Sequence, residues 1–570
     1  MEPAAARPAL LRAASPWISY AAVAGVAVLL LGYVVLPLLA TFRESVVGTR
    51  GFTLEQYRAF FSFAHPANLE SLRTSLWISI LSVVTCGTTG VTLAFLLNRI
   101  EFPGRRALEI VSLVPLALPP LIGVYTFVFL YAESGIVPRG LQVLFHLPAA
   151  PFALRGIPGV LVVHTFTMYP YFYLAAAAAL AGLDPSLEEA ASNLGAARWQ
   201  VWTRVILPLL TPALVAGSLL VFMVSMASYT APLIFGVDRT MTMQIYISRT
   251  NGDLTLASVQ ATILSAVSIG FLVTMRWYQG RRIYRSLSKG TAAARAEVRH
   301  PMARAAVASA AAVLVLILIA PILVLILISF SKDATWTVQV LPPVYTLQNY
   351  ARLVTDRQTW APIRNSLDMS TLSTFGDVLL GVAAAYVIAR LTVAGKGLLD
   401  IAVMLPWALP GTVVGINLIT AFNQPSAFSL GRILVGTFWI LPLAYFVRGL
   451  PLVFRSTSAT MAQLDPALEE AAANLGASWW YAFRRVTLPL IGRGVLAGAL
   501  LAFAQGVGEF VASILIYTPA SRPLSVAIYN QLYSFQFGTA AAYGVFQVMI
   551  VLVVLMVVRG PSRGGTLPMG

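Results

Sequence analysis

Two acidic residues inside long apolar stretches are the strongest candidates for chemistry in this chain. Glu509 lies in the stretch 506–511, which reads GVGEFV, and Asp377 lies in another apolar stretch. A charged side chain within a membrane span costs about 2.5 to 3.5 kcal/mol on insertion scales, so it normally faces a cavity or a partner. Glu509 could therefore line a polar pathway or form a structural hydrogen bond to a neighbouring helix. Asp377 is the second candidate.

Motifs of enzymatic chemistry are missing from the sequence. We find no GxxxxGK[ST] phosphate loop, no His/Cys metal cluster and no nucleophile elbow. The single cysteine, Cys86, lies in an apolar stretch and is expected to be a buried packing residue. His164 has no other histidine or cysteine nearby, so we expect a packing residue there too. The chain is predicted to have no catalytic residue, to bind no cofactor and not to hydrolyse ATP by itself.

The composition is that of a membrane protein with several spans. Of the 570 residues, 58% are hydrophobic and 11% are charged, whereas a soluble domain has about 25% charged residues. The net charge of +16 comes from short basic clusters between apolar runs rather than from one polar domain. Such clusters are typical of a cytoplasmic membrane face, so we expect a lipid bilayer, and not nucleic acid, as the partner.

Apolar runs long enough to cross a bilayer recur along the chain, and such runs must be helical because lipid offers the backbone no hydrogen bonds. The first six runs lie near residues 18–40, 73–97, 107–131, 158–182, 209–235 and 256–278. The second six lie near residues 304–330, 367–390, 398–422, 432–455, 490–516 and 537–559. The predicted fold class is an all-α polytopic membrane protein with about 12 transmembrane helices.

A phrase that occurs twice organises these helices. Residues 184–195 read DPSLEEAASNLG and residues 465–476 read DPALEEAAANLG, 281 residues apart, and each is followed by an aliphatic-x-Leu-Pro ending. Each copy predicts a short helix with an aspartate cap, early acidic residues and a terminal glycine. Its Ala-Ala pair leaves a surface that suits docking of another protein. A loop helix that duplication merely copied is the alternative.

The duplication divides the chain into a first half at residues 1–278, a basic linker at residues 279–303 and a second half at residues 304–570. The positive-inside bias places both termini, the linker and both phrases in the cytoplasm. Because each half has an even number of spans, we expect two parallel six-helix repeats. The first half also has about ten extra residues in a predicted external loop near residues 133–158, which is either a partner surface or an inert length variation.

The repeat makes the predicted pathway chemically asymmetric, because Glu509 corresponds to Ser228 and Gln505 corresponds to Val224. Asn417 is expected to form an interhelical hydrogen bond. The candidate pathway residues all carry a polar group in or beside an apolar stretch: Glu509, Gln505, Ser225, Ser228, Tyr229 and Asp377.

The two phrases resemble the cytoplasmic loop of type I ATP-binding-cassette importer permeases, and the fusion of two halves is similar to the ferric-iron subgroup. This resemblance implies coupling helices that dock two cytoplasmic ATPase subunits, which bind ATP and Mg, and an external or periplasmic solute-binding protein that delivers the substrate. It also implies a multi-pass protein of the bacterial cytoplasmic (inner) membrane. The implied coupling residues are Glu188, Glu189, Ala190, Ala191, Gly195, Glu469, Glu470, Ala471, Ala472 and Gly476.

The resemblance favours import of ferric iron by alternating access. The glycine-acid-aromatic element at residues 508–510 is also similar to one in polyamine and sulfate or molybdate permeases, so thiamine, a polyamine or another small organic solute stays open. Ferric iron would require oxygen ligands, and the intramembrane carboxylates are too few for a tight site. A proton- or sodium-coupled secondary transporter and a membrane scaffold are the remaining alternatives. The docking phrases favour the ATP-driven importer, because an ion-driven carrier has no use for them.

Overall fold

The computed structural model describes residues 16–48, 51–62, 66–281, 296–297, 300–336, 339–391 and 395–559. These residues are almost entirely helical. Their strands form two short pairs, β1 (Val47–Gly48) antiparallel to β2 (Gly51–Phe52), and β3 (Ile100–Glu101) parallel to β4 (Ala296–Glu297). The predicted all-α fold class is therefore confirmed.

The first half contains fourteen α-helices in the described residues. They are α2 (Pro16–Leu30), α3 (Leu36–Val46), α4 (Glu55–Phe60), α5 (Pro66–Arg99), α6 (Arg105–Val111), α7 (Pro120–Tyr131), α8 (Ile136–Leu144), α9 (Gly156–Ala181), α10 (Pro185–Asn193), α11 (Arg198–Val201), α12 (Leu207–Met226), α13 (Thr230–Phe235), α14 (Met241–Thr250) and α15 (Leu254–Arg281). Three short turns join some of them: π-helices at Leu31–Val35 and Trp202–Ile206 and a 3₁₀-helix at Val114–Ala117.

The second half follows the same order. Its described helices are α16 (Pro301–Ser329), α17 (Gln348–Thr355), α18 (Arg357–Arg390), α19 (Lys396–Ala408), α20 (Gly411–Phe422), α21 (Ile440–Ala462), α22 (Ala467–Asn474), α23 (Trp479–Ala482), α24 (Leu488–Val507), α25 (Ser513–Ile516), α26 (Leu524–Tyr533) and α27 (Phe537–Arg559). A 3₁₀-helix at Ala427–Ser429 and a π-helix at Phe483–Thr487 complete the set.

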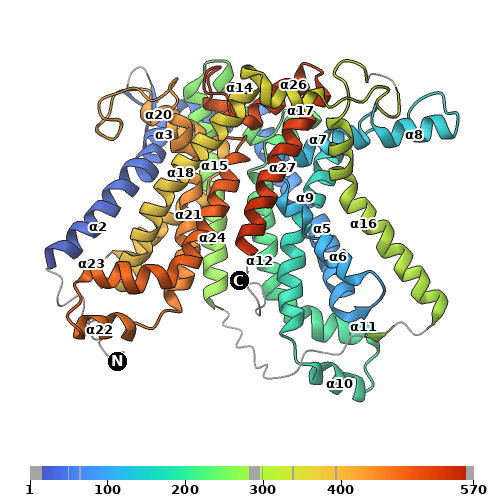
Figure 1. The fold of residues 1–570 in the computed structure, drawn as a ribbon, viewed down its shortest axis with the longest axis horizontal. Helices are drawn as coiled ribbons and strands as arrows, with labels where there is room; N and C mark the ends of the chain where they lie inside the picture. The colour runs from blue at the N-terminus through green and yellow to red at the C-terminus, as the bar shows by residue number, and fades with distance from the viewer. Residues whose placement is uncertain are drawn as a thin grey trace.

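Ten helices of the described residues are long and apolar enough to cross a membrane, and the bent pair α19–α20 makes eleven if it is one span. Helix α21, which overlaps the predicted run 432–455, has spanning length but is more polar than these. It packs between α18 and α24 (Figure 1). The described helices therefore agree with a polytopic membrane protein.

Several predicted spans are shorter or broken in the structure. The run 107–131 is divided among α6, the Val114–Ala117 turn and α7, and the run 398–422 bends by 113° between α19 and α20. Prolines 115, 119, 120 and 410 lie at these breaks, where the missing N–H and the ring interrupt helical hydrogen bonding. The runs 209–235 and 490–516 also end early, because α12 stops at Met226 and α24 at Val507. These four predictions of continuous helices were wrong.

The repeat is also seen in how the helices of each half pack. Each half has a three-helix core, α5, α9 and α12 in the first and α18, α21 and α24 in the second. The helices approach closely at a glycine: a Cβ on Gly90 of α5 would lie 2.6 Å from the carbonyl oxygen of Tyr169 on α9. Small residues of this kind allow close helix packing within membranes.

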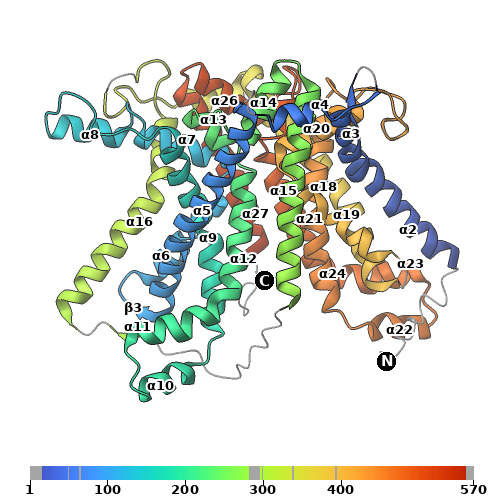
Figure 2. The same ribbon diagram turned by 180° about the vertical axis from the view of Figure 1, so that it is seen from behind.

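The first long helix of each half packs on the other half. Helices α2 and α3 contact α18, α19 and α20, and α16 contacts α6 and α7 (Figures 1 and 2). Tyr33 donates a hydrogen bond to the carbonyl of Phe428 at 2.9 Å, and the hydroxyls of Thr41 and Thr420 lie 2.8 Å apart. The halves at 1–278 and 304–570 are thus interlocked sequence repeats. Most of the predicted linker 279–303 lies outside the described residues.

The two ends of the molecule differ. Helices α10 and α22 lie at one end, on opposite sides of it, and the long helices spread apart toward them (Figures 1 and 2). Helices α14 and α26 lie at the other end, where the two halves converge. We refer to these as the α10/α22 end and the α14/α26 end.

Candidate functional site

The two copies of the repeated phrase form the short helices α10 and α22. The Asp184 carboxylate accepts a hydrogen bond from the backbone N–H of Ser186 at 2.9 Å, and Asp465 accepts one from Ala467 at the same distance. The bond from Ser186 lowers the pKa of Asp184 below its ordinary value, because it stabilises the charged form. Aspartates thus satisfy the first N–H groups of each helix, as the sequence predicts.

A glycine ends each of these helices in the left-handed conformation. Gly195 has a φ of +83° and Gly476 a φ of +84°. The following N–H groups turn back to the helix: Ala196 donates to the carbonyl of Ala191 at 3.1 Å, and Ala477 to that of Ala472 at 3.0 Å. Residues other than glycine are strained at this φ. The glycines therefore fix the direction in which the chain enters α11 and α23.

An ion pair ties each helix to the end of a long core helix. Glu188 of α10 pairs with Arg99, the last residue of α5. In the second half, Glu469 Oε2 of α22 lies 3.2 Å from Arg390 Nε, at the end of α18. The repeat aligns these residues with each other. The first glutamate of each Glu-Glu pair is thus an anchor to the membrane helices, a contact that was not predicted from the sequence.

The second anchor is more deeply buried than the first. Glu469 is 2% exposed, and its Oε1 also accepts a hydrogen bond from Thr487 at 2.8 Å. Ile206 occupies the equivalent position in the first half, where no such bond is possible. The side chain of Glu188 is 27% exposed. The two short helices are therefore similar in backbone and unequal in the burial of their ion pairs.

The outward face of α10 and α22 is exposed and partly apolar. Glu189, Ala190 and Ala471 are exposed, and Glu470 is half-buried. The leucines before the terminal glycines, Leu194 and Leu475, are 87% and 89% exposed. The tryptophans Trp199 and Trp480 are exposed nearby at equivalent positions. Large apolar side chains exposed together in this way mark an interaction surface.

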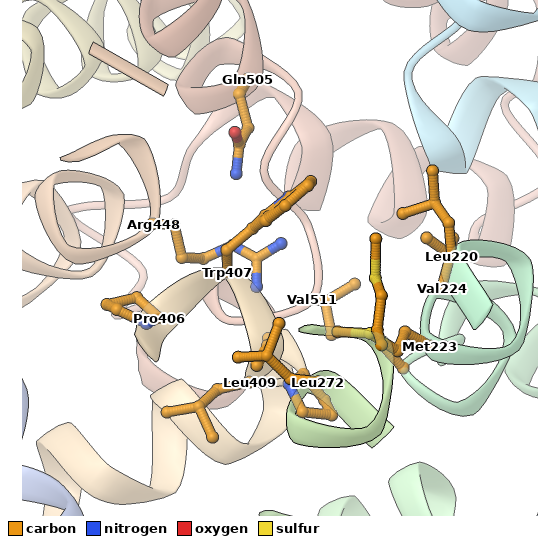
Figure 3. A pocket seen from close by; sticks show the side chains of 15 residues that line it. Leu220, Met223, Val224, Leu272, Pro406, Trp407, Leu409, Arg448, Gln505 and Val511 are labelled. Atoms are coloured by element: carbon orange, nitrogen blue, oxygen red, sulfur yellow. The ribbon is translucent and has the colours of Figure 1, made fainter. Parts of the chain in front are cut away.

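A cavity of about 200 Å³ lies between the two halves (Figure 3). Its walls come from α12 and α15 of the first half and from α19, α20, α21 and α24 of the second. The bend between α19 and α20 forms one side. The lining residues are Leu220, Met223, Val224, Ala227, Leu272, Met275, Pro406, Trp407, Ala408, Leu409, Pro410, Gly411, Arg448, Gln505 and Val511.

Of the predicted pathway residues, only Gln505 lines this cavity. Glu509 is 6% exposed and lies behind the wall, where its Oε2 is 2.6 Å from Arg448 Nε. Its Oε1 accepts a hydrogen bond from the N–H of Ala512 at 2.9 Å. Arg448 itself lines the cavity. This arginine is not among the pathway residues predicted from the sequence, although its position within the predicted span 432–455 carried the same signal as Glu509.

A cluster of one histidine and three serines occupies the equivalent place in the first half. His164 Nε2 lies 2.8 Å from the hydroxyl of Ser228, the counterpart of Glu509. His164 Nδ1 lies 2.9 Å from the hydroxyl of Ser82 and 3.3 Å from that of Ser225. His164 is thus a buried residue with hydrogen-bond partners, as predicted. Ser225 and Ser228 belong to this cluster and not to the cavity lining.

Equivalent aromatic residues meet where the halves converge. The rings of Tyr229 and Phe510, which the repeat aligns, have centroids 6.1 Å apart. Tyr246 lies 5.4 Å from Tyr229, and Tyr529 lies 5.5 Å from Phe510. Tyr229 and Phe510 are each 1% exposed. This cluster, which we name the aromatic closure, joins the halves near α14 and α26.

Asp377 lies apart from both the cavity and the aromatic closure. It is 1% exposed, and among the described residues neither carboxyl oxygen has a hydrogen-bond partner. A Cβ on Gly449 of α21 would collide with its Oδ2. The repeat aligns it with Cys86, which is fully buried as predicted. Asn417 Oδ1 also accepts no hydrogen bond from the described residues, so this oxygen does not supply the interhelical hydrogen bond predicted for Asn417.

Metal-binding clusters do not occur in the described residues, since no three His, Cys, Asp or Glu side chains come together in a way that could hold an ion. The arrangement combines three features of the two halves. It has anchored helices at one end, an interface cavity with one charged lining residue, and an aromatic closure at the other end.

Relatives of this chain are transport proteins. The family model described as "Binding-protein-dependent transport system inner membrane component" matches residues 88–283 and 377–560. A probable ABC transporter permease of Sinorhizobium fredii is 29% identical over 94% of this chain and 95% of its own length. A ferric transport system permease of Actinobacillus pleuropneumoniae is 25% identical over 94% of this chain and 77% of its own.

A solved bacterial ABC transporter involved in alginate import matches 45% of this chain and 93% of its own, with 20% identity and a TM-score of 0.35. The family match covers both halves, in agreement with the internal repeat. This chain belongs to the family of binding-protein-dependent transport system inner membrane components, and its relatives are permeases of ABC transporters.

Proposed function

We propose that the chain imports ferric iron across the bacterial cytoplasmic membrane, driven by two separate ATPase subunits that dock on α10 and α22. The observation that carries the docking part is the repeated exposed surface at Leu194, Trp199, Leu475 and Trp480. The iron part is supported by the ferric transport permease, which aligns with 94% of this chain. ATP and Mg are bound by the partner subunits, and this chain binds no cofactor.

The α10/α22 end is the cytoplasmic one in this proposal. Arg204 and Arg485 are exposed there at equivalent positions, in line with the positive-inside bias. The α14/α26 end then faces outward and receives the solute-binding protein. Glu189, Glu470, the Ala-Ala pairs and the exposed leucines form the contact with the ATPases.

Closure of the ATPase subunits would draw α10 and α22 toward each other. The ion pairs of Glu188 and Glu469 transmit this movement to α5 and α18, and Gly195 and Gly476 keep the loops at a fixed angle to α12 and α24. Because Tyr229 and Phe510 come from different halves, rotation of the halves separates their rings. The aromatic closure then opens outward while the cytoplasmic side closes, which is alternating access.

A secondary transporter driven by protons or sodium is less consistent with the site. Both oxygens of Glu509 are engaged, one by Arg448 and the other by the N–H of Ala512. Such a carboxylate is not available to exchange an ion during each cycle.

The test is uptake by proteoliposomes that contain this chain, its ATPase and its iron-loaded binding protein. We expect ⁵⁵Fe to accumulate only when ATP is present on the side of the membrane that carries the ATPase. Uptake should stop when an ATPase variant that binds but does not hydrolyse ATP replaces the active one. A matched sample without ATPase, given a proton or sodium gradient, should take up none. Gradient-driven uptake in that sample would refute the ATP-driven mechanism, and ATP hydrolysis coupled to a different solute would refute iron.

A further inference from the structure

The cavity between the halves presents a positive charge. Arg448 is the one charged residue among the fifteen that line it. Figure 3 shows its guanidinium extending into the cavity beside Trp407, with Gln505 on one side and Val511 on the other. Its Nε is paired with Glu509. Among the described residues, Nη1 and Nη2 donate no hydrogen bond, so both face the cavity as free donors.

The carboxylate of Glu509 does not offset the positive charge of Arg448 for a solute that passes through the cavity. Its Oε2 forms the ion pair with Arg448, its Oε1 accepts a hydrogen bond from the N–H of Ala512, and both oxygens lie behind the wall. Among the lining side chains, only that of Gln505 contains an oxygen atom. A hard, highly charged cation needs several oxygen ligands, and a guanidinium repels it. The cavity therefore does not suit a bare ferric ion.

A guanidinium with two free N–H groups suits an oxyanion, because it can donate two parallel hydrogen bonds to neighbouring oxygens. The amide of Gln505 supplies a further donor across the cavity. The remaining lining is apolar, so such a solute would be held by few contacts and released easily. This weak, localised attraction is what a passage site requires.

We propose that the cavity at Arg448 and Gln505 is a passage site for anionic oxygen ligands, so that the solute crosses as an oxyanion or as an iron ion already coordinated by one. The passage of iron as such a complex rests on the function proposed above. The arginine guides the anion, and Glu509 holds the arginine in place by binding its Nε. Inorganic phosphate is the simplest probe of this chemistry.

A double-label uptake experiment tests the solute. The full complex in proteoliposomes receives ⁵⁵Fe and ³²P-phosphate in a Tris-chloride medium in which phosphate is the sole oxyanion. We expect ATP-dependent entry of both labels in a constant ratio. Entry of ⁵⁵Fe without ³²P would overturn the anion site and leave the iron importer standing. Entry of ³²P without any need for iron would support the anion site and reject iron, and entry of neither label would count against both.

A set of variants tests the residue. Arg448→Gln combined with Glu509→Gln removes both charges and leaves no buried carboxylate unpaired. We expect its uptake to fall about 10- to 100-fold, the loss expected for a charge-assisted hydrogen bond, while it still assembles with the ATPase. Arg455→Gln on the same helix, at an exposed position, is the matched control and should transport normally. Normal uptake by the double variant would mean that Arg448 merely neutralises Glu509, and would refute the proposal.

Discussion

The unequal burial of the two anchoring ion pairs leads to a quantitative prediction. Glu469→Gln removes the counter-ion of Arg390, whose side chain is 8% exposed. Breaking a buried pair in this way typically costs about 3 to 5 kcal/mol, because a charge is left without compensation. Glu188→Gln acts on a pair with side chains 13% and 27% exposed, where solvent screening limits the loss to about 1 kcal/mol. We expect a difference of about 2 to 4 kcal/mol between these isosteric variants.

Reversible unfolding by SDS in mixed detergent micelles measures this difference. Tryptophan fluorescence is a suitable signal, because Trp479 and Trp480 lie in α23, the next helix after α22. Addition of Arg390→Gln to Glu469→Gln should restore part of the lost stability, since the uncompensated charge is then gone. Equal destabilisation by Glu188→Gln and Glu469→Gln would refute the reasoning from burial. So would a double variant whose loss is the full sum of the two single losses.

Three further changes test the coupling surface and the core. Glu189→Lys with Glu470→Lys should abolish co-purification of the ATPase while the unfolding midpoint stays unchanged; normal co-purification would contradict the docking role. Gly476→Ala places a side chain at a φ of +84° and should destabilise the protein by about 1 kcal/mol, seen as a lower unfolding midpoint, whereas an unchanged midpoint would contradict the strain. Gly449→Ala should cost about 1 to 3 kcal/mol through its collision with Asp377, and Asp377→Ala should relieve most of this loss in the same unfolding assay; an equal loss without Asp377 would place the clash elsewhere.

Short-range features were predictable from the sequence. The N-capping aspartates and the left-handed glycines of α10 and α22 follow from residues within about ten positions of each other. Local chemistry sets these features, so a single copy of the phrase is enough to predict them. The prediction of continuous helices at residues 107–131 and 398–422 also failed for a local reason. It rested on hydropathy alone, whereas prolines decide where these helices end.

Features that depend on distant partners were not predictable in the same way. The sequence identified Glu509 as a costly charge, but its role depends on Arg448, 61 positions earlier on α21. Glu188 and Glu469 also occupy equivalent positions in the sequence repeat. Their burial differs because residues from other elements surround them, including Thr487 in place of Ile206.

By itself, the sequence determined that this is a duplicated, helical membrane protein with two copies of a short capped helix, because hydropathy and a repeated motif are local properties of the chain. Only the tertiary structure decided which groups face the cavity and which lie behind its wall. It also decided that α2 and α16 each pack on the opposite half, and that Tyr229 meets Phe510 between the halves. These arrangements follow from how helices far apart in the chain pack together, and packing depends on shape and on partners that periodicity does not encode.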